Sequence, residues 1–234
     1  MIDLLQNHPF FNDKIIESCE LLENQGYCNE NYLLVADGVK YVVRSFNKND
    51  SNREEEYNIQ KQAHLAGIAP QPFVLNLQDG YMIMEYIEGK HEKNPDLFLL
   101  YTLVDAVGVL HDSVFIDKEM VKARNLVKTR NKDIVEALEI IEDHVEECVV
   151  CHNDLNSMNI LWYENKPILI DFEYASANDC YFDLAALSIE FNLEKDVESL
   201  MLRRYFGGGY YYREKFEAYK IIYTQLCKEW FENM

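Results

Sequence analysis

Three polar side chains in the second half of the chain have the types and spacing needed for phosphoryl transfer. Asp154 and Asn159 lie five positions apart, and Asp171 follows after a short apolar segment. The carboxylate of Asp154 can orient and deprotonate an attacking hydroxyl. The oxygens of Asn159 and Asp171 can hold Mg²⁺ on the phosphates of a nucleotide. This pattern predicts a kinase that uses ATP and Mg²⁺, and it leaves open whose hydroxyl is phosphorylated.

Short strands are expected around these residues. The β-rich runs are Val149–Cys151, Ile160–Tyr163 and Ile168–Ile170, with a turn at 165–167. The last two runs form a hairpin, so the two metal-binding side chains would converge from its ends. Taken singly, each polar residue could instead be an Asx residue that caps a loop.

Composition limits the class of protein. The chain has 234 residues, of which 48% are hydrophobic, which gives room for one large domain or two small lobes around a shared cleft. The formal net charge of −19 argues against binding to nucleic acid or to an anionic membrane surface. Most of this charge is expected to form a solvated surface, and the remainder is compatible with a small cationic substrate that carries a hydroxyl.

The cysteines and the apolar runs bear on the cellular setting. No basic segment followed by an apolar stretch begins the sequence, and no apolar run approaches the roughly 20 residues of a transmembrane helix. We therefore expect no membrane insertion and a cytoplasmic protein with free thiols. Cys148 and Cys151 form a single CxxC pattern, which predicts buried strand thiols rather than a zinc or redox site.

The first part of the chain is predicted to be rich in strands. Asp-Gly turns at positions 37–38 and 79–80 indicate two hairpins. Asn52 to about Ala66 is expected to be helical, with Ser51 or Asn52 as the N-cap and Gly67 at the end. Residues 1–20 are expected to contain helix. That helix is indicated by Ile15, Ile16 and Leu21, which lie at helical spacing. The strands expected in the two hairpins are Asn31–Val35, Lys40–Phe46, Val74–Leu77 and Tyr81–Tyr86.

Helices are predicted to dominate the rest of the chain. The expected segments are Asp96–His111, Ile134–His144 and the region from Phe182 to the end, with a break at the three glycines 207–209. A polar joint at 88–90 separates the two parts. The predicted fold class is therefore α+β, with an N-terminal nucleotide-binding lobe at 1–87 and a C-terminal catalytic and acceptor-binding lobe at 88–234.

The motif His-x-Asp-x4-Asn, followed by Ile-Asp-Phe, resembles the catalytic segment of the eukaryotic-protein-kinase-like superfamily. The resemblance implies a bilobal kinase-like fold, with a small β-rich N-lobe and a mainly helical C-lobe. Glu173 stands where protein kinases carry glycine, no Ala-Pro-Glu follows, and no long activation loop is present. These departures indicate the small-molecule branch, which comprises aminoglycoside phosphotransferases and choline/ethanolamine kinases.

Within that branch the chain is most similar to bacterial choline kinases of the LicA type. The matching segments are His152-Asn153-Asp154-Leu155, Ile170-Asp171-Phe172-Glu173-Tyr174-Ala175, Asn178-Asp179 and Phe182-Asp183-Leu184-Ala185. Aminoglycoside enzymes more often have His-Gly-Asp, whereas thiamine kinases share the Asp-aromatic-Glu-Tyr run. The resemblance covers about residues 150–190 and, more weakly, about residues 24–90.

The resemblance implies a role for individual residues. In the C-terminal lobe, Asp154 would act on the hydroxyl, Asn159 and Asp171 would bind the metal, and His152 would support the loop. In the N-terminal lobe, the nucleotide-binding residues would be Asn31, Arg44, Glu56 and the hinge residues Glu85, Tyr86 and Ile87. Arg44 takes the place of the usual phosphate-binding lysine, and Glu56 would pair with it, with Glu55 as the nearest alternative. The loop at 24–32 would bind phosphate through its backbone N–H groups, although it has one glycine where the family's loop has two.

Residues that recognise the acceptor are expected to include Asn156, Glu173, Tyr174 and Asp183, with Asp183 as an alternative anchor for its helix. Aromatic faces and carboxylates bind quaternary ammonium groups, and the chain has 16 Tyr, 12 Phe and 2 Trp. The leading hypothesis is a kinase for a small amino alcohol, with choline ahead of ethanolamine. The alternatives are a kinase of the same fold for thiamine, an aminoglycoside or a sugar amine, and a nucleotide-binding pseudokinase, which the glycine-poor loop would favour.

Overall fold

The computed structural model describes residues 2–23, 29–47 and 52–232. Contacts between residues divide the chain into two units, Met1–Glu88 and Gly89–Met234. The first is built on an antiparallel sheet and the second is mainly helical, which confirms the predicted α+β class. No helix within the described residues is long and apolar enough to cross a membrane.

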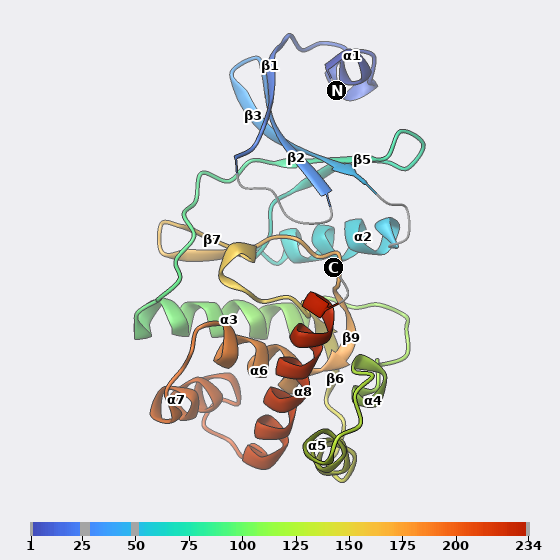
Figure 1. The fold of residues 1–234 in the computed structure, drawn as a ribbon. Coiled ribbons are helices and arrows are strands. Elements are labelled where there is room, and N and C mark those ends of the chain that lie inside the picture. The colour runs from blue at the N-terminus through green and yellow to red at the C-terminus, as the bar shows by residue number, and fades with distance from the viewer. Residues whose placement is uncertain (1, 24–28, 48–51, 233–234) are drawn as a thin grey trace. The chain divides into compact units, whose positions relative to one another are not determined.

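The first unit contains a five-stranded antiparallel sheet with the strand order β1-β2-β3-β5-β4 (Figure 1). Asp37 and Gly38 join β2 to β3 and both have positive φ, as a two-residue hairpin turn requires. Both predicted hairpins are confirmed. The strands are β1 (Ile16–Leu21), β2 (Asn29–Ala36), β3 (Val39–Phe46), β4 (Pro72–Asn76) and β5 (Tyr81–Glu85).

The helix expected within residues 1–20 was placed wrongly. Helix α1 (Ile2–Gln6) and the 3-10 turn η1 (Pro9–Phe11) are short, and the apolar residues used for the prediction lie in or beside strand β1. Ile15 is 75% exposed, and Leu21 is also exposed. Three apolar residues at this spacing fit one helix face as well as an edge strand, so periodicity could not separate the two.

One face of the sheet packs against a hydrophobic cluster, and the other face packs against helix α2 (Arg53–Leu65). Leu5 and Phe11 of the N-terminal segment pack with Val43 and Tyr41 of β3 in a buried hydrophobic cluster. Because side chains alternate along a strand, Arg44 points to the opposite face. Helix α2 contacts Arg44 on that face, begins at the side-chain cap of Asn52 and ends before Gly67, as predicted.

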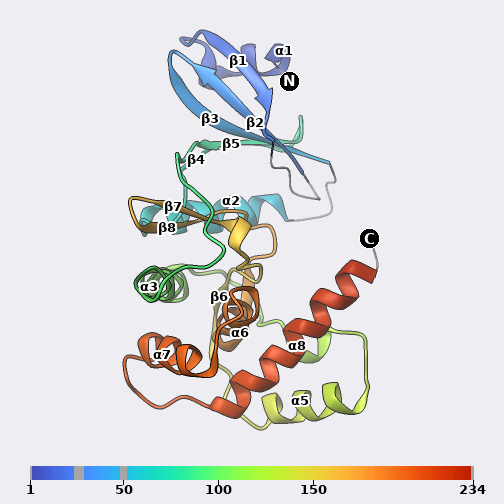
Figure 2. The ribbon, with the colours of Figure 1, turned by 60° about the vertical axis from the view of Figure 1, so that its left-hand side comes forward.

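Helices form most of the second unit, and the long C-terminal helix α8 packs against α5 and α6 (Figure 2). The predicted helices are confirmed, with ends shifted by a few residues, and the short α4 was not predicted. The helices are α3 (Leu97–Ser113), α4 (Ala123–Leu126), α5 (Lys132–Glu142), α6 (Cys180–Glu190), α7 (Lys195–Tyr205) and α8 (Arg213–Glu232).

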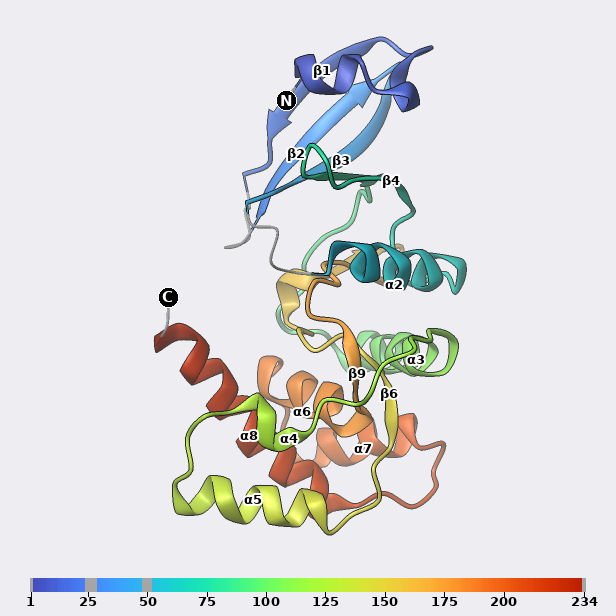
Figure 3. The same cartoon turned by 90° about the vertical axis from the view of Figure 1, so that its right-hand side faces the viewer.

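Two small antiparallel pairs of strands carry the catalytic motifs. Strand β6 (Cys148–Cys151) pairs with β9 (Ser176–Asp179), as Figure 3 shows, and β7 (Ile160–Tyr163) pairs with β8 (Lys166–Leu169). Strand β9 was not predicted.

Two local expectations about these strands need correction. The β7–β8 turn was expected at 165–167, but its central residues are Glu164 and Asn165, both with positive φ, and Pro167 lies inside β8. A proline at the second position of this short strand is tolerated because Trp162, which lies opposite it, exchanges its backbone hydrogen bonds with Lys90, so this position needs no N–H toward β7. Cys151 is buried as expected, whereas Cys148 is exposed.

Candidate active site

The β7–β8 hairpin brings the two expected metal-binding residues together. Asn159 precedes β7, and Asp171 follows β8 by two positions. The backbone N–H of Ile170 donates to the carbonyl of Asn159 at 3.0 Å, which closes the open end of the hairpin. Asp171 has a φ of +67°, a conformation that Asp adopts more readily than most residues, and the chain turns there. The side chains thus flank one hairpin end.

The carboxylate of Asp154 is held by two amide side chains. Asn159 Nδ2 donates to Asp154 Oδ2 at 2.6 Å and to its backbone carbonyl at 2.9 Å. Asn156 Nδ2 donates to Asp154 Oδ1 at 3.0 Å, while its own oxygen accepts from the N–H of Met158. Because the nitrogen of Asn159 is engaged, its side-chain oxygen is the atom that could coordinate a cation. The 3-10 turn η2 (Ser157–Asn159) fixes this arrangement.

The electrostatics of Asp154 suit a cation site. Burial raises the pKa of Asp154, His152 and the amides of Asn156 and Asn159 oppose the shift, and the charge of Asp171 adds to it. Two carboxylates that repel each other in a partly dry site are stabilised by a cation placed beside both. Carboxylate and amide oxygens are the donors that Mg²⁺ prefers. The residues present therefore fit Mg²⁺.

His152 links the two loops from within the core. Its side chain is fully buried, Nε2 donates to the carbonyl of Ile170 at 3.0 Å, and its ring packs on Phe172 with centroids 4.9 Å apart. Within the described residues, Nδ1 has no hydrogen-bond partner. A buried ring that bonds to a backbone carbonyl is a support for the loop, in agreement with the role expected from the sequence.

Asn153 organises the far side of the catalytic loop, and this role was not predicted. Its φ is +65°, which explains why either glycine or asparagine suits a position between His and Asp. Nδ2 donates to the carbonyl of Tyr174 at 2.9 Å and to Ser176 Oγ at 2.8 Å, and Oδ1 accepts from Asn178 at 2.8 Å. Tyr174 and its neighbour Glu173 are thereby held beside the catalytic loop.

Asp183 has a different role from the acceptor contact that was expected. Its side chain is fully buried in the first turn of α6. Oδ2 accepts the backbone N–H of His152 at 2.7 Å, and Oδ1 accepts that of Asn153 at 2.9 Å. A carboxylate that is closed off and bound in this way has no surface to offer a substrate. Asp183 therefore anchors the catalytic loop and is not an acceptor-binding residue.

The segment that begins the second unit supports the same loop. His91 Nδ1 donates to the carbonyls of Ser157 and Ile160, at 3.2 and 3.0 Å, and so spans η2. Lys90 forms a two-way backbone pair with Trp162 of β7. A Cβ at Gly89 would lie 3.0 Å from that of Leu161, so glycine permits this close approach. A lone histidine and a glycine gave no sequence signal for these contacts.

In the first unit, Arg44 and Glu56 form a buried ion pair. Arg44 Nη1 lies 2.9 Å from Glu56 Oε1, and Arg44 Nε donates to Asn31 Oδ1 at 3.2 Å. Arg53, which was not predicted, binds the second oxygen of Glu56 at 2.7 Å. Glu56, rather than Glu55, therefore faces the cation. The structure brings three of the predicted nucleotide-binding residues together, and their role toward a nucleotide stays a prediction.

The expected hinge lies at the end of β5. The N–H of Glu85 donates to the carbonyl of Gln71 at 2.8 Å, and its carboxylate accepts the N–H of Gln71 at 3.0 Å. The ammonium of Lys40 lies 5.2 Å from the ring centroid of Tyr86, and Ile87 is half-buried. Of the expected phosphate loop, residues 24–28 lie outside the described part of the chain.

Comparison with known proteins identifies the family and the fold. A model of the phosphotransferase enzyme family matches residues 23–219. Protein LicA of Haemophilus influenzae is 27% identical over 205 residues, which cover 77% of this chain and 60% of that protein. A choline/ethanolamine kinase family protein from Mesorhizobium loti has a structure with a TM-score of 0.78 and 21% identity, covering 97% of this chain and 83% of that one.

Two further structures have the same fold. Choline kinase LicA from Streptococcus pneumoniae gives a TM-score of 0.77 at 20% identity, over 98% of this chain and 89% of that one. A structure of LicA in complex with AMP gives a TM-score of 0.75 at 21% identity, covering 98% of this chain and 86% of that one. The bilobal kinase-like fold is thereby confirmed.

The family match spans most of the chain, so this protein belongs to the phosphotransferase enzyme family. The predicted class of enzyme, a small-molecule phosphotransferase, is confirmed, as is the resemblance to choline kinase relatives.

Proposed function

We propose that this protein transfers the γ-phosphoryl group of ATP to the hydroxyl of a small amino alcohol, with choline as the leading candidate and ethanolamine second. The observation that carries the proposal is the loop in which Asn156 and Asn159 hold both carboxylate oxygens of Asp154 at 3.0 and 2.6 Å. Asp171 lies close enough to perturb the pKa of Asp154. A positioned base beside two oxygen ligands is the equipment of a phosphotransferase.

In this mechanism the chain positions groups rather than forming a covalent intermediate. Asp154 accepts a hydrogen bond from the acceptor hydroxyl, orients it for in-line attack and takes its proton. The oxygens of Asn159 and Asp171 would hold Mg²⁺, which neutralises charge on the phosphates when bound. The forked donors of Arg44, oriented by Glu56, suit nucleotide phosphates.

Support for ATP and for choline comes from different sources. A related LicA structure contains AMP, which supports an adenine nucleotide. Two structural neighbours are described as choline/ethanolamine kinase family and choline kinase proteins. Tyr174, which is 44% exposed, and Glu173 lie on the turn that Asn153 holds beside Asp154, so an aromatic face and a carboxylate are available to a cation near the base.

A coupled assay of ADP release tests the proposal directly. Choline, ethanolamine, thiamine, an aminoglycoside and a sugar amine are compared as acceptors with Mg²⁺-ATP. We expect the highest kcat/KM for choline. If thiamine, an aminoglycoside or a sugar amine turns over and choline does not, the acceptor assignment is wrong while the phosphotransferase assignment stands. Thermal stabilisation by Mg²⁺-ATP without turnover of any acceptor would instead indicate a pseudokinase.

A further inference from the structure

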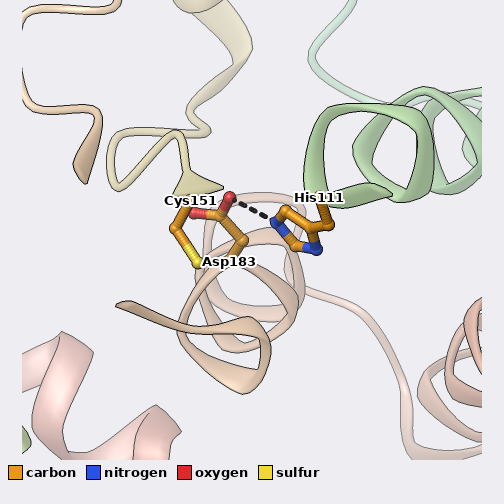
Figure 4. Close-up of side chains that lie close together, drawn as sticks. All are labelled: His111, Cys151 and Asp183. Atoms are coloured by element: carbon orange, nitrogen blue, oxygen red, sulfur yellow. Dashed lines mark hydrogen bonds and ion pairs between the residues drawn. The ribbon is translucent and has the colours of Figure 1, made fainter. Parts of the chain in front are cut away.

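A cluster of His111, Cys151 and Asp183 lies buried in the second unit, next to the catalytic loop (Figure 4). The three side chains come from α3, β6 and α6, and one ligand-type atom of each lies within 4.8 Å of the others. Such a set could hold a soft metal ion, or it could form a hydrogen-bond network that serves the loop. The two possibilities differ in the protonation and the bonding that they require.

The bonding of the cluster favours a network. Burial, followed by the charge of Asp183, raises the pKa of the Cys151 thiol well above its usual range, so the thiolate that a metal needs is disfavoured. The thiol donates to the carbonyl of Asp179 at 3.3 Å. Both oxygens of Asp183 accept backbone N–H groups, whose positive ends would oppose a cation at the same atoms.

His111 supplies the remaining donor to this carboxylate. Its Nε2 donates to Asp183 Oδ2 at 3.0 Å, and the hydroxyl of Tyr205 lies 2.7 Å from its Nδ1. In the tautomer whose Nε2 proton faces the carboxylate, Nδ1 accepts a hydrogen bond from Tyr205. His111 and Asp183 are almost completely buried, so water does not compete for these bonds. The series Tyr205–His111–Asp183 connects α7, α3 and α6.

We propose that His111 is a positioning residue for phosphoryl transfer, and that Tyr205 fixes the orientation of its ring. The bond from His111 holds Asp183 in the orientation in which its two oxygens receive the N–H groups of His152 and Asn153. Those two residues immediately precede Asp154, so a rotated Asp183 carboxylate would release the loop that presents the base. The catalytic part of this inference rests on the proposed function, whereas the bonds to the loop can be measured without turnover.

Amide hydrogen exchange tests the network directly. In His111→Leu, we expect the amides of residues 152 and 153 to exchange about 10-fold faster or more, because Asp183 loses a buried charge-assisted bond. Tyr205→Phe, an isosteric change, should give a smaller increase, and peptides from α5 should be unaffected. The control is Asp105→Asn, which breaks the exposed Arg204–Asp105 pair between the same helices α7 and α3 and should leave the loop unchanged. Unchanged exchange at 152–153 in His111→Leu overturns the proposal.

Steady-state kinetics test the catalytic consequence. We expect His111→Leu to lower kcat by about 10-fold or more with KM for Mg²⁺-ATP within about 3-fold, because misplacement of the base affects the transition state more than ground-state binding. His111→Gln retains an N–H donor and should recover part of the loss. A variant that is folded but less stable, with unchanged kcat, contradicts the positioning role. If the wild-type protein phosphorylates no acceptor, the proposed function fails, and the exchange experiment still decides the network.

Discussion

Glu56 is a buried residue of the first unit at which a single change of charge should be costly. Its side chain is 2% exposed, and its two oxygens bind the guanidinium groups of Arg44 and Arg53, whose side chains are 6% and 5% exposed. Glu56→Gln keeps the size of the side chain and leaves two buried cations without their shared counter-charge. Removing one partner from a buried pair costs about 3–5 kcal/mol, and the amide oxygen can still accept one bond, so we expect about 3 kcal/mol.

A matched control separates this effect from the general loss of an acid near a helix start. Glu54 lies in the same first turn of α2 and is exposed. Glu54→Gln should cost less than about 1 kcal/mol, the range of an exposed helix-dipole interaction. Unfolding by urea gives both free energies. In a thermal scan, about 3 kcal/mol corresponds to a fall in Tm of roughly 6–12 °C for a chain of this size.

The same pair of variants tests whether Arg44 contributes to nucleotide binding. If Arg44 binds phosphate, Glu56→Gln should raise the Kd for Mg²⁺-ATP by about 10-fold or more, since a buried, bonded charge has been disturbed, while Glu54→Gln should change it less than about 2-fold. Titration calorimetry at a temperature where both variants are folded measures this. Equal losses of stability in the two variants would refute the reasoning that the buried pair dominates.

Three further predictions concern the second unit. Asn153→Gly keeps a residue that tolerates a φ of +65° but removes three side-chain hydrogen bonds, so it should lower the free energy of unfolding by about 1–3 kcal/mol. Asn153→Val should lower it further, because a β-branched residue adds backbone strain at this φ. Urea unfolding in which the Val variant is as stable as the Gly variant would contradict this. His91→Leu leaves the carbonyls of Ser157 and Ile160 without their donor and should cost about 1–3 kcal/mol with a fall in kcat, whereas unaltered kcat would show that η2 does not depend on this bond. Burial acts to raise the pKa of Glu229, but the backbone N–H groups of Lys128 and Thr129 lower it to about 2. A carboxyl group whose pKa is lowered by folding stabilises the fold at pH values above its unfolded-state pKa near 4.3, and this stabilisation is lost as the pH falls toward 2. Glu229→Gln should therefore lower the free energy of unfolding at pH 7 by under about 1 kcal/mol after solvent screening, and the difference from the wild type should vanish near pH 2. A difference that grows on acidification would contradict the assignment.

Local chemistry made the hairpins and the helix starts predictable. Asp37-Gly38 supplies the positive φ values that its turn needs, and the side chain of Asn52 caps α2. The types and spacing of Asp154, Asn159 and Asp171 likewise pointed to one hairpin end. In each case, neighbours in the sequence determine the conformation, so the sequence alone carries the information.

Contacts between distant segments could not be predicted in the same way. Asp183 was expected near the acceptor, but it binds the backbone of residues 152 and 153, about 30 positions earlier in the chain. Lys215 is fully buried against Asp179, and no pattern in α8 distinguishes it from a solvated lysine. The helical expectation for Ile15 and Ile16 failed because a few apolar residues cannot separate an edge strand from a helix face.

The central claim is that Asp154 is the base of a phosphotransferase whose acceptor is a small amino alcohol. The most direct measurement compares choline-dependent ADP release by the wild-type protein and by Asp154→Asn, with Mg²⁺-ATP binding measured in both. We predict that the variant loses turnover by about 10³-fold or more while it binds Mg²⁺-ATP with an affinity within a few-fold of the wild type. Choline turnover close to the wild-type rate in Asp154→Asn would contradict the account.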